Sequence, residues 1–264
     1  MPLRLAVQQA LLPGATVAEQ FANAAEYGFA GVELNHNERF DVRRHVDVLA
    51  AAADATGIAV AAICTTPAED PLVADREDRN RRVTTLAELV DAASALGAAG
   101  VISVPIRRSS TFDAPQLPEL AIEVYQRAAG YLGAGSAAIF LEPLNRYEAT
   151  FLNRVGQAAI LARMTEHPRV RALADLFHMN IEETSLDGPI LEAGGLLGHV
   201  HIADNTRDEP GAGMMAMAPA LSALNRIDYA GWVSLECRGL SGTPDVALPT
   251  SVRHLQSLWD RVVG

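Results

Sequence analysis

The chain has 264 residues, of which 49% are hydrophobic, and a formal net charge of −11 from 21 basic and 32 acidic residues. This length and composition suffice for one large buried core, so we expect a single domain over residues 1–264. The acidic balance and the lack of a basic stripe argue against a nucleic-acid partner, and no apolar stretch is long enough to cross a bilayer.

Short apolar runs alternate with longer alanine-rich segments, and no hairpin signal joins two adjacent runs. This alternation predicts parallel strands with helices between them. A first helix is expected after Thr16, because Glu19 completes a capping box and Gly28 ends the apolar pattern. A long helix with one apolar face is expected over Arg79–Leu96. In chain order, the predicted strands are Leu3–Gln8, Gly31–Leu34, Ile58–Cys64, Gly100–Pro105, Ala137–Glu142, Val170–Asp175, His199–Ala203 and Trp232–Glu236.

Eight strand–helix units in a chain of this length are typical of a closed barrel. The alternative is an open, doubly wound sheet, which usually has a glycine-rich turn after its first strand. Here the first turn reads QQALLPGAT and contains no GxGxxG motif. We therefore predict the α/β class and a single (β/α)₈ TIM barrel.

Four ionisable side chains lie at the ends of apolar runs in the second half of the chain, three directly after SAAIFL, VRALA and GWVSL and one within GHVHIAD. Active sites of such barrels form at the carboxyl ends of the strands, so these residues are candidates for function. Their separations of 33, 26 and 35 residues each correspond to one strand–helix unit. They should therefore meet at one rim of the barrel. The four are Glu142, Asp175, His201 and Glu236.

Three carboxylates and one imidazole are costly to gather in a partly dry cavity, and a divalent cation removes that cost. We therefore expect one divalent metal ion with these four side chains as its ligands. Oxygen-rich ligation with one nitrogen and no thiolate favours Mn²⁺, with Mg²⁺ or Co²⁺ as alternatives, over structural zinc. A polar helix cap explains any one of the four side chains, but it explains the whole set poorly.

Further polar residues lie near the predicted rim. Glu33 ends the second strand and either faces the cavity or is a surface acid close to a helix. His199 shares a strand face with His201, because side chains repeat every two residues along a strand. It is either a partner behind the site or a buried structural histidine. Met214, Met215 and Met217 are either core packing or a mobile apolar lip of the site, and core packing is preferred.

At these positions the sequence resembles the xylose isomerase-like superfamily of sugar isomerases and epimerases, and within it the ketose 3-epimerases of the D-tagatose 3-epimerase type. The segments LEPLNRYE, DLFHMNIEE, GHVHIADNTRDEPGAG and VSLE resemble that family's active-site segments in order and spacing. The resemblance implies the same four metal ligands, with Glu142 and Glu236 also acting as the acid/base pair. It further implies a homo-oligomer, dimer or tetramer, and sugar contacts from Glu148, His178 and Arg207.

The first half of the chain matches that family only through its barrel pattern. Substrate-shaping residues there are often aromatic in the family, whereas QQALLP, ICTTP and VPIRR have few rings and leave Phe112 as an isolated candidate. The identity of the sugar therefore stays open. Lysine is absent and no glycine-rich phosphate cradle occurs, which favours a free sugar over a phosphorylated one.

The expected reaction is metal-dependent epimerisation at C3, or isomerisation, of a small ketose. A cation on the carbonyl and a neighbouring hydroxyl would stabilise the enediolate left when the adjacent proton departs, and two glutamates on opposite faces would invert the centre. Hydroxypyruvate isomerase and inosose-type isomerase or dehydratase are alternatives with the same equipment. An endonuclease would need more histidine ligands and a basic surface. A non-catalytic metal- or sugar-binding barrel belongs to another class, and both intact glutamates disfavour it.

The compartment is inferred from the start of the chain and from its cysteines. The first residues lack the apolar run and cleavage pattern of a secretion signal. Cys64 and Cys237 lie far apart without a CxxC motif, as expected for free thiols in a reducing compartment. We therefore expect a cytoplasmic protein.

Overall fold

Eight parallel strands close into a barrel in the computed structural model, which describes residues 2–65, 71–108, 115–133 and 137–264. The strands pair in chain order, and β8 returns to β1 with Arg4 opposite Trp232. Each predicted strand is present, with ends that differ by a few residues at most, so the (β/α)₈ prediction is confirmed. The strands are β1 (Arg4–Gln8), β2 (Gly31–His36), β3 (Ala59–Thr65), β4 (Gly100–Ser103), β5 (Ala138–Leu141), β6 (Val170–Asp175), β7 (Leu197–Ile202) and β8 (Trp232–Leu235).

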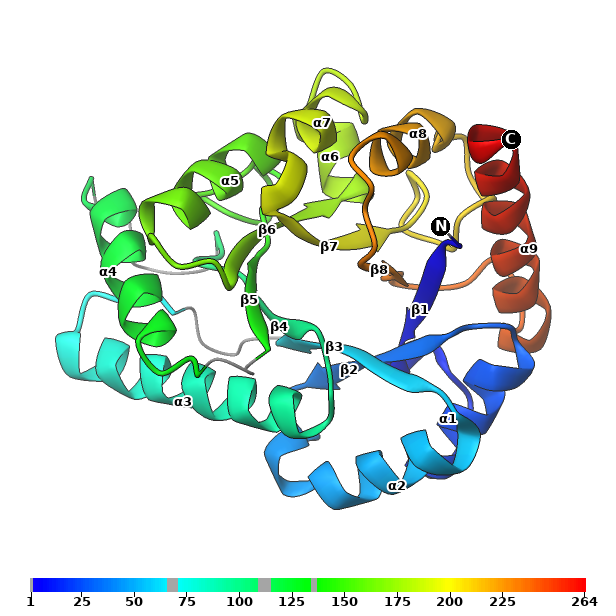
Figure 1. Ribbon diagram of the computed structural model, residues 1–264, viewed down its shortest axis with the longest axis horizontal. Helices are drawn as coiled ribbons and strands as arrows, with labels where there is room; N and C mark the ends of the chain where they lie inside the picture. Colours follow the sequence, from blue (N-terminus) through cyan, green and yellow to red (C-terminus); the bar gives the residue numbers. More distant parts are fainter. Residues whose placement is uncertain (1, 66–70, 109–114, 134–136) are drawn as a thin grey trace.

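Helices surround the strands on the outside of the barrel (Figure 1). The first begins where the sequence predicts, because the Thr16 hydroxyl accepts from the Glu19 amide and the Glu19 side chain accepts from the Thr16 amide. The α-helices are α1 (Val17–Glu26), α2 (Val46–Thr56), α3 (Arg76–Ala95), α4 (Leu117–Ala129), α5 (Val155–Met164), α6 (Leu176–Glu182), α7 (Gly188–Ala193), α8 (Ala218–Arg226) and α9 (Pro244–Val263). Short 3₁₀ turns lie at η1 (Gln9–Leu11), η2 (Val42–Arg44) and η3 (Gly194–Leu196).

The interior of the barrel is filled around the ring of Phe140 on β5. A separate buried apolar cluster contains Phe140 with Cys64, Ile102 and other strand residues. Gly100 and Gly198 approach this ring closely, since a Cβ at either position would lie 2.5 Å from a Phe140 ring carbon. Glycines on β4 and β7 therefore make the space that the aromatic ring of β5 occupies. This packed floor closes the barrel beneath its carboxyl-terminal mouth.

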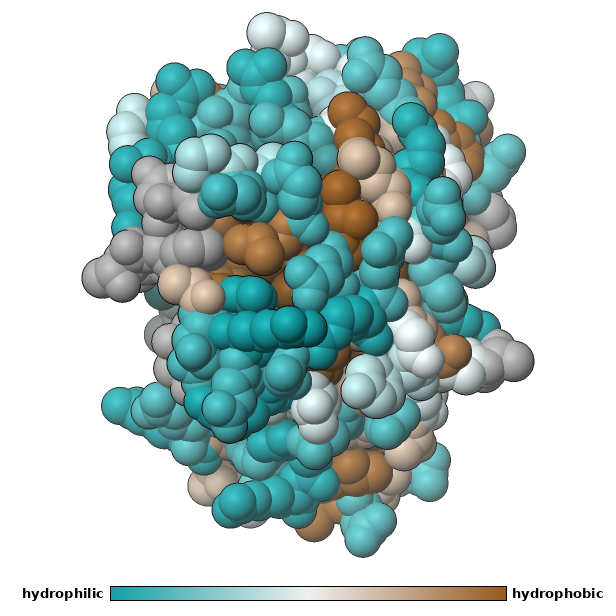
Figure 2. Space-filling model, turned by 90° about the vertical axis from the view of Figure 1, so that its left-hand side faces the viewer, coloured by the Kyte–Doolittle hydropathy of each residue, from teal (hydrophilic) through white to brown (hydrophobic). Residues whose placement is uncertain are grey.

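The outer surface is mostly hydrophilic on the face shown in Figure 2, with apolar side chains exposed only in limited areas. In the described parts of the chain, no helix is long and apolar enough to cross a membrane. The assignment of stretch 214–217 to the core was wrong in part. Met217, the N-cap residue of α8, is buried, but Met214 is 85% exposed in the loop that precedes this helix.

Candidate functional site

The four predicted strand-end residues meet at the carboxyl-terminal mouth of the barrel. One oxygen or nitrogen from each of the four lies within 4.8 Å of the corresponding atoms of the others. Glu142 and Glu236 follow the last residues of β5 and β8, while Asp175 and His201 lie on β6 and β7. Consecutive parallel strands thus deliver one side chain each to the same point, as their spacing predicts.

Asp175 uses its two oxygens differently. Its Oδ1 caps α6 by accepting from the amide of Phe177 at 2.8 Å and that of His178 at 3.4 Å. Its buried Oδ2 accepts no hydrogen bond within the described chain, although Nη1 of Arg207 lies 3.1 Å away. A carboxylate oxygen held in this way, facing the other three side chains, is suited to a cation.

His201 stands between two carboxylates of the cluster. Its Nδ1 lies 3.1 Å from Glu142 Oε1 and 3.2 Å from Glu236 Oε2. Burial lowers the pKa of His201, but Glu33, Glu236 and Glu142 outweigh it and hold the pKa well above the usual value. The imidazole is therefore protonated in the cation-free chain and compensates part of the negative charge, a task that a metal ion would take over.

The two glutamates of the cluster have opposite pKa shifts. Burial, followed by the negative charge of Glu236, raises the pKa of Glu142 to about 7. Burial opposes ionisation of Glu236 too, but His201 and Arg207 outweigh it and hold its pKa well below the usual value. Two carboxyl groups whose environments separate their pKa values in this way are suited to exchanging protons with a substrate.

The three residues expected to contact a sugar surround the same opening. Glu148, His178 and Arg207 line a cavity of about 200 Å³ together with Glu142 and Glu236. Arg207 forms ion pairs with Asp175 and Glu236, and its guanidinium lies 4.4 Å from the centre of the Phe177 ring.

Loop β5–α5 orients His178 within this cavity. The backbone amide of Asn145 donates to His178 Nδ1 at 3.1 Å, and its side chain donates to Glu148 at 3.0 Å. Burial lowers the pKa of His178, with Arg207 acting in the same direction and Asp175 opposing it. His178 is therefore a neutral ring whose Nε2 faces the cluster.

Glu33 and His199, the weaker candidates, lie directly behind the cluster. Both are completely buried, so the alternative of a surface acid for Glu33 is wrong. The sequence could not show this, since β2 is buried on both faces and its apolar run does not tell which side of the barrel wall Glu33 faces. Phe112 lies outside the described residues.

Gln8 and Cys64, two side chains that contact Glu236 of the cluster, were missed by the sequence reasoning. Gln8, the last residue of β1, donates from Nε2 to Glu33 and to Glu236, each at 3.0 Å. Cys64 on β3 places Sγ 4.0 Å from Glu236 Oε1, and its thiol is free and buried. Both lie at the carboxyl ends of strands, so the rule that found the charged residues extends to uncharged polar ones. Burial raises the pKa of the Cys64 thiol well above its usual value, so it is a neutral neighbour rather than a thiolate ligand.

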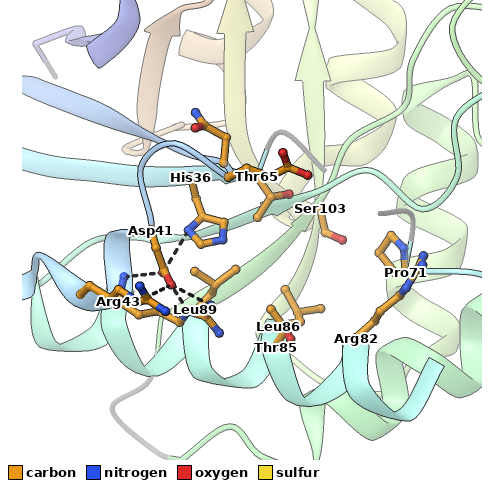
Figure 3. Close-up of a pocket in the computed structure, with 13 residues that line it drawn as sticks. His36, Asp41, Arg43, Thr65, Pro71, Arg82, Thr85, Leu86, Leu89 and Ser103 are labelled. Carbon is orange, nitrogen blue, oxygen red and sulfur yellow. Dashed lines mark hydrogen bonds and ion pairs between the residues drawn. The ribbon is translucent and has the colours of Figure 1, made fainter. Parts of the chain in front are cut away.

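A second cavity, of about 340 Å³, lies between the ends of β2–β4 and α3 (Figure 3). His36 and Thr65 lie on its strand side, and Leu86 and Leu89 on its helix side. Asp41 on this rim is paired with Arg43. Thr65 lines this cavity and the first one, so the two adjoin at the end of β3.

The chain matches the family described as "Xylose isomerase-like TIM barrel" over residues 21–258. It is 27% identical to the 3-dehydro-D-guloside 4-epimerase of Escherichia coli strain K12 over 263 residues, which cover 94% of this chain and 97% of that protein. It is also 33% identical to a ketose 3-epimerase of Arthrobacter globiformis over 199 residues, covering 72% and 65% of the two chains.

Solved structures agree with these sequence relatives. The crystal structure of 3-keto-D-glucoside 4-epimerase from E. coli superposes with a TM-score of 0.87 at 25% identity, covering 97% of this chain and 99% of the other. D-allulose 3-epimerase from Methylomonas, solved with D-allulose, shares the fold with a TM-score of 0.87 at 22% identity, covering 97% of each chain. The chain therefore belongs to the xylose isomerase-like TIM barrel family, and it is a carbohydrate epimerase of the isomerase class.

Proposed function

We propose that the chain epimerises a small free ketose at C3 in a single catalytic domain over residues 1–264. The observation that carries this proposal is the arrangement of Glu142 and Glu236 around one cavity, with Asp175 and His201 beside them. Proton removal next to a carbonyl needs a base on one face, an acid on the other, and a means to stabilise the developing oxyanion. Glu142 and Glu236 supply the two carboxyl groups, and the four-residue cluster suits a cation that would stabilise the oxyanion.

The donor set suits one divalent cation held by Glu142, Asp175, His201 and Glu236, and Mn²⁺ is our first choice with Mg²⁺ or Co²⁺ as alternatives. Asp175 Oδ2, which is buried and accepts no hydrogen bond from the described residues, supports this assignment. When bound, such an ion acts as a Lewis acid toward the carbonyl and a neighbouring hydroxyl of the sugar.

The protein side chains would then divide the work. One of Glu142 and Glu236 removes the C3 proton, and the other returns a proton to the opposite face, which inverts the carbon. Glu148, His178 and Arg207 would bind sugar oxygens from the wall of the cavity. Return of the proton to the carbonyl carbon would instead give aldose–ketose isomerisation, so substrate placement decides the outcome.

A second candidate function is epimerisation at C4 of a 3-keto glycoside. The nearly full-length likeness to the E. coli 3-dehydro-D-guloside 4-epimerase favours it. The cavity of about 340 Å³ that adjoins the site at Thr65 also offers room for a glycosidic substituent, which a free ketose does not have. Both reactions move a proton on a carbon next to a ketone, so the same two glutamates serve either one.

The deciding experiment incubates the Mn²⁺-loaded protein in deuterated water with free ketoses, ketose phosphates, hydroxypyruvate and a 3-keto glucoside, and follows the carbon-bound protons by NMR. We expect deuterium at C3 of a free ketose together with its C3 epimer. Deuterium at C4 of the 3-keto glucoside would establish the second candidate instead. Protein stripped with a chelator is the control, and no exchange into any of these substrates would refute both assignments.

A further inference from the structure

Glu33 lies at the centre of a buried hydrogen-bond network behind the candidate metal ligands. It lies on β2, is 0% exposed, and receives three side-chain donors. Its Oε2 lies 2.7 Å from His199 Nε2, and its Oε1 lies 3.0 Å from His201 Nε2 and 3.0 Å from Gln8 Nε2. A fully desolvated carboxylate is stable only with such partners. Glu33 is therefore a fixed acceptor, not a group that contacts substrate.

The two ring nitrogens of His201 face different partners. Its Nδ1 faces Glu142 and Glu236 in the cluster, whereas its Nε2 faces Glu33. An imidazole that binds a cation through one nitrogen must carry its remaining proton on the other. Glu33 accepts a hydrogen bond from Nε2 of His201. The tautomer with its proton on Nε2 and a lone pair on Nδ1 is the one that can bind a cation in the cluster.

Hydrogen bonds from His199 and Gln8 fix the position of the Glu33 carboxylate. The Nδ1 of His199 has no hydrogen-bond partner among the described residues, so its proton is placed on Nε2, which donates to Glu33. The His199 ring also stacks on Phe140, with ring centres 5.3 Å apart and planes 16° from parallel. Gln8 donates to Glu33 and to Glu236 from the same Nε2. One carboxylate is thereby linked directly to His201 and, through one amide group, to Glu236.

We propose, on the basis of the cation site proposed above, that Glu33 is a positioning residue that orients two of its four ligands. With an ion on Nδ1, it would keep the remaining proton of His201 on Nε2, and through Gln8 it fixes the rotamer of Glu236. The polar network behind the site thus belongs to the binding machinery and is not only a satisfied patch of core. Mutation of the residue that accepts a hydrogen bond from a metal-binding histidine typically lowers metal affinity by about 10- to 100-fold.

A rival interpretation is that Glu33, His199 and His201 hold a second ion, because their donor atoms also lie within 4.8 Å of one another. Two features oppose it. All three side chains are 0% exposed, so no open position for water remains. Gln8 also occupies one of the two Glu33 oxygens. The number of ions bound per chain separates the two interpretations.

The test compares Mn²⁺ binding to the wild type, Glu33→Gln and Glu26→Gln by isothermal titration calorimetry. Glu26→Gln makes the same chemical change at an exposed position on α1 and serves as the control. We expect one ion per chain in the wild type, a Kd raised about 10- to 100-fold in Glu33→Gln, and no change in the control. An unchanged Kd in folded Glu33→Gln, or two ions in the wild type, would overturn the proposal.

A second measurement uses the wild type alone, in case the buried substitution prevents folding. Long-range ¹H–¹⁵N NMR of histidine-labelled protein loaded with diamagnetic Zn²⁺ reports which His201 nitrogen carries the proton. We expect the proton on Nε2 and the metal on Nδ1, and the reverse arrangement would overturn the proposal. A wild type that binds no ion at the cluster would instead refute the proposed function, so the two failures are distinguishable.

Discussion

Replacement of Glu142 by glutamine should change how the stability of the cation-free protein depends on pH. Burial and the charge of Glu236 raise the pKa of Glu142 from 4.5 to about 7. A carboxyl whose pKa is raised on folding stabilises the fold fully below its unfolded pKa, and this contribution is lost as the pH rises through the folded value. Each pKa unit corresponds to about 1.4 kcal/mol, so the full contribution of Glu142 to the free energy of unfolding is about 3 kcal/mol. Of this contribution, about 2–3 kcal/mol is lost between about pH 5 and about pH 8.

The assay is urea unfolding of chelator-treated wild type and Glu142→Gln at these two pH values. The stability of the wild type relative to the variant should fall by about 2–3 kcal/mol at the higher pH. Glu182→Gln is the control, because the hydrogen bond from Arg146 lowers the pKa of Glu182, so this group is ionised above about pH 5 in both states. A constant difference between wild type and Glu142→Gln, or an increase with pH, would refute the reasoning.

Four further substitutions test the packing, the capping and the sugar site. Gly198→Ala should lower the free energy of unfolding, measured with urea, by about 1–3 kcal/mol, because its Cβ would lie 2.5 Å from the Phe140 ring. In the same assay, Gly156→Ala in α5 should raise the free energy of unfolding by up to about 1 kcal/mol, because its Cβ would meet nothing within 4 Å. Thr16→Ala removes the capping box of α1 and should cost about 1 kcal/mol in the same assay. Arg207→Lys keeps the charge but loses the fork that reaches Asp175 and Glu236, so kcat/KM should fall at least about 10-fold in steady-state kinetics, and unchanged kinetics would count against Arg207 as a sugar contact.

The strand pattern allowed the fold and the four-residue cluster to be predicted together. Val170–Asp175 was predicted with the ends that the structure has. Strand ends matter here because each cluster residue lies at or near the end of its apolar run, and in parallel strands all such ends meet at one mouth. Glu142, for example, could be placed without knowledge of any contact.

The partners behind the cluster could not be predicted in the same way. Gln8 is an uncharged residue at a strand end, and neither its bond to Glu33 nor its bond to Glu236 has a local sequence signature. These contacts join β1, β2 and β8, and only closure of the barrel brings them together. The cavity between α3 and the strand ends depends likewise on helix placement, which the apolar stripe of Arg79–Leu96 orients but does not position.

In the proposed reaction, Glu142 and Glu236 move the protons. The most direct test measures the rate of epimer formation in the Mn²⁺-loaded wild type, Glu142→Gln and Glu236→Gln. NMR in deuterated water follows the reaction of the substrate that the wild type turns over. Loss of a general acid or base typically lowers the rate about 10²- to 10⁴-fold, so both variants should form essentially no epimer while they remain folded and still bind the sugar. Full epimerase activity in either variant would contradict the mechanism.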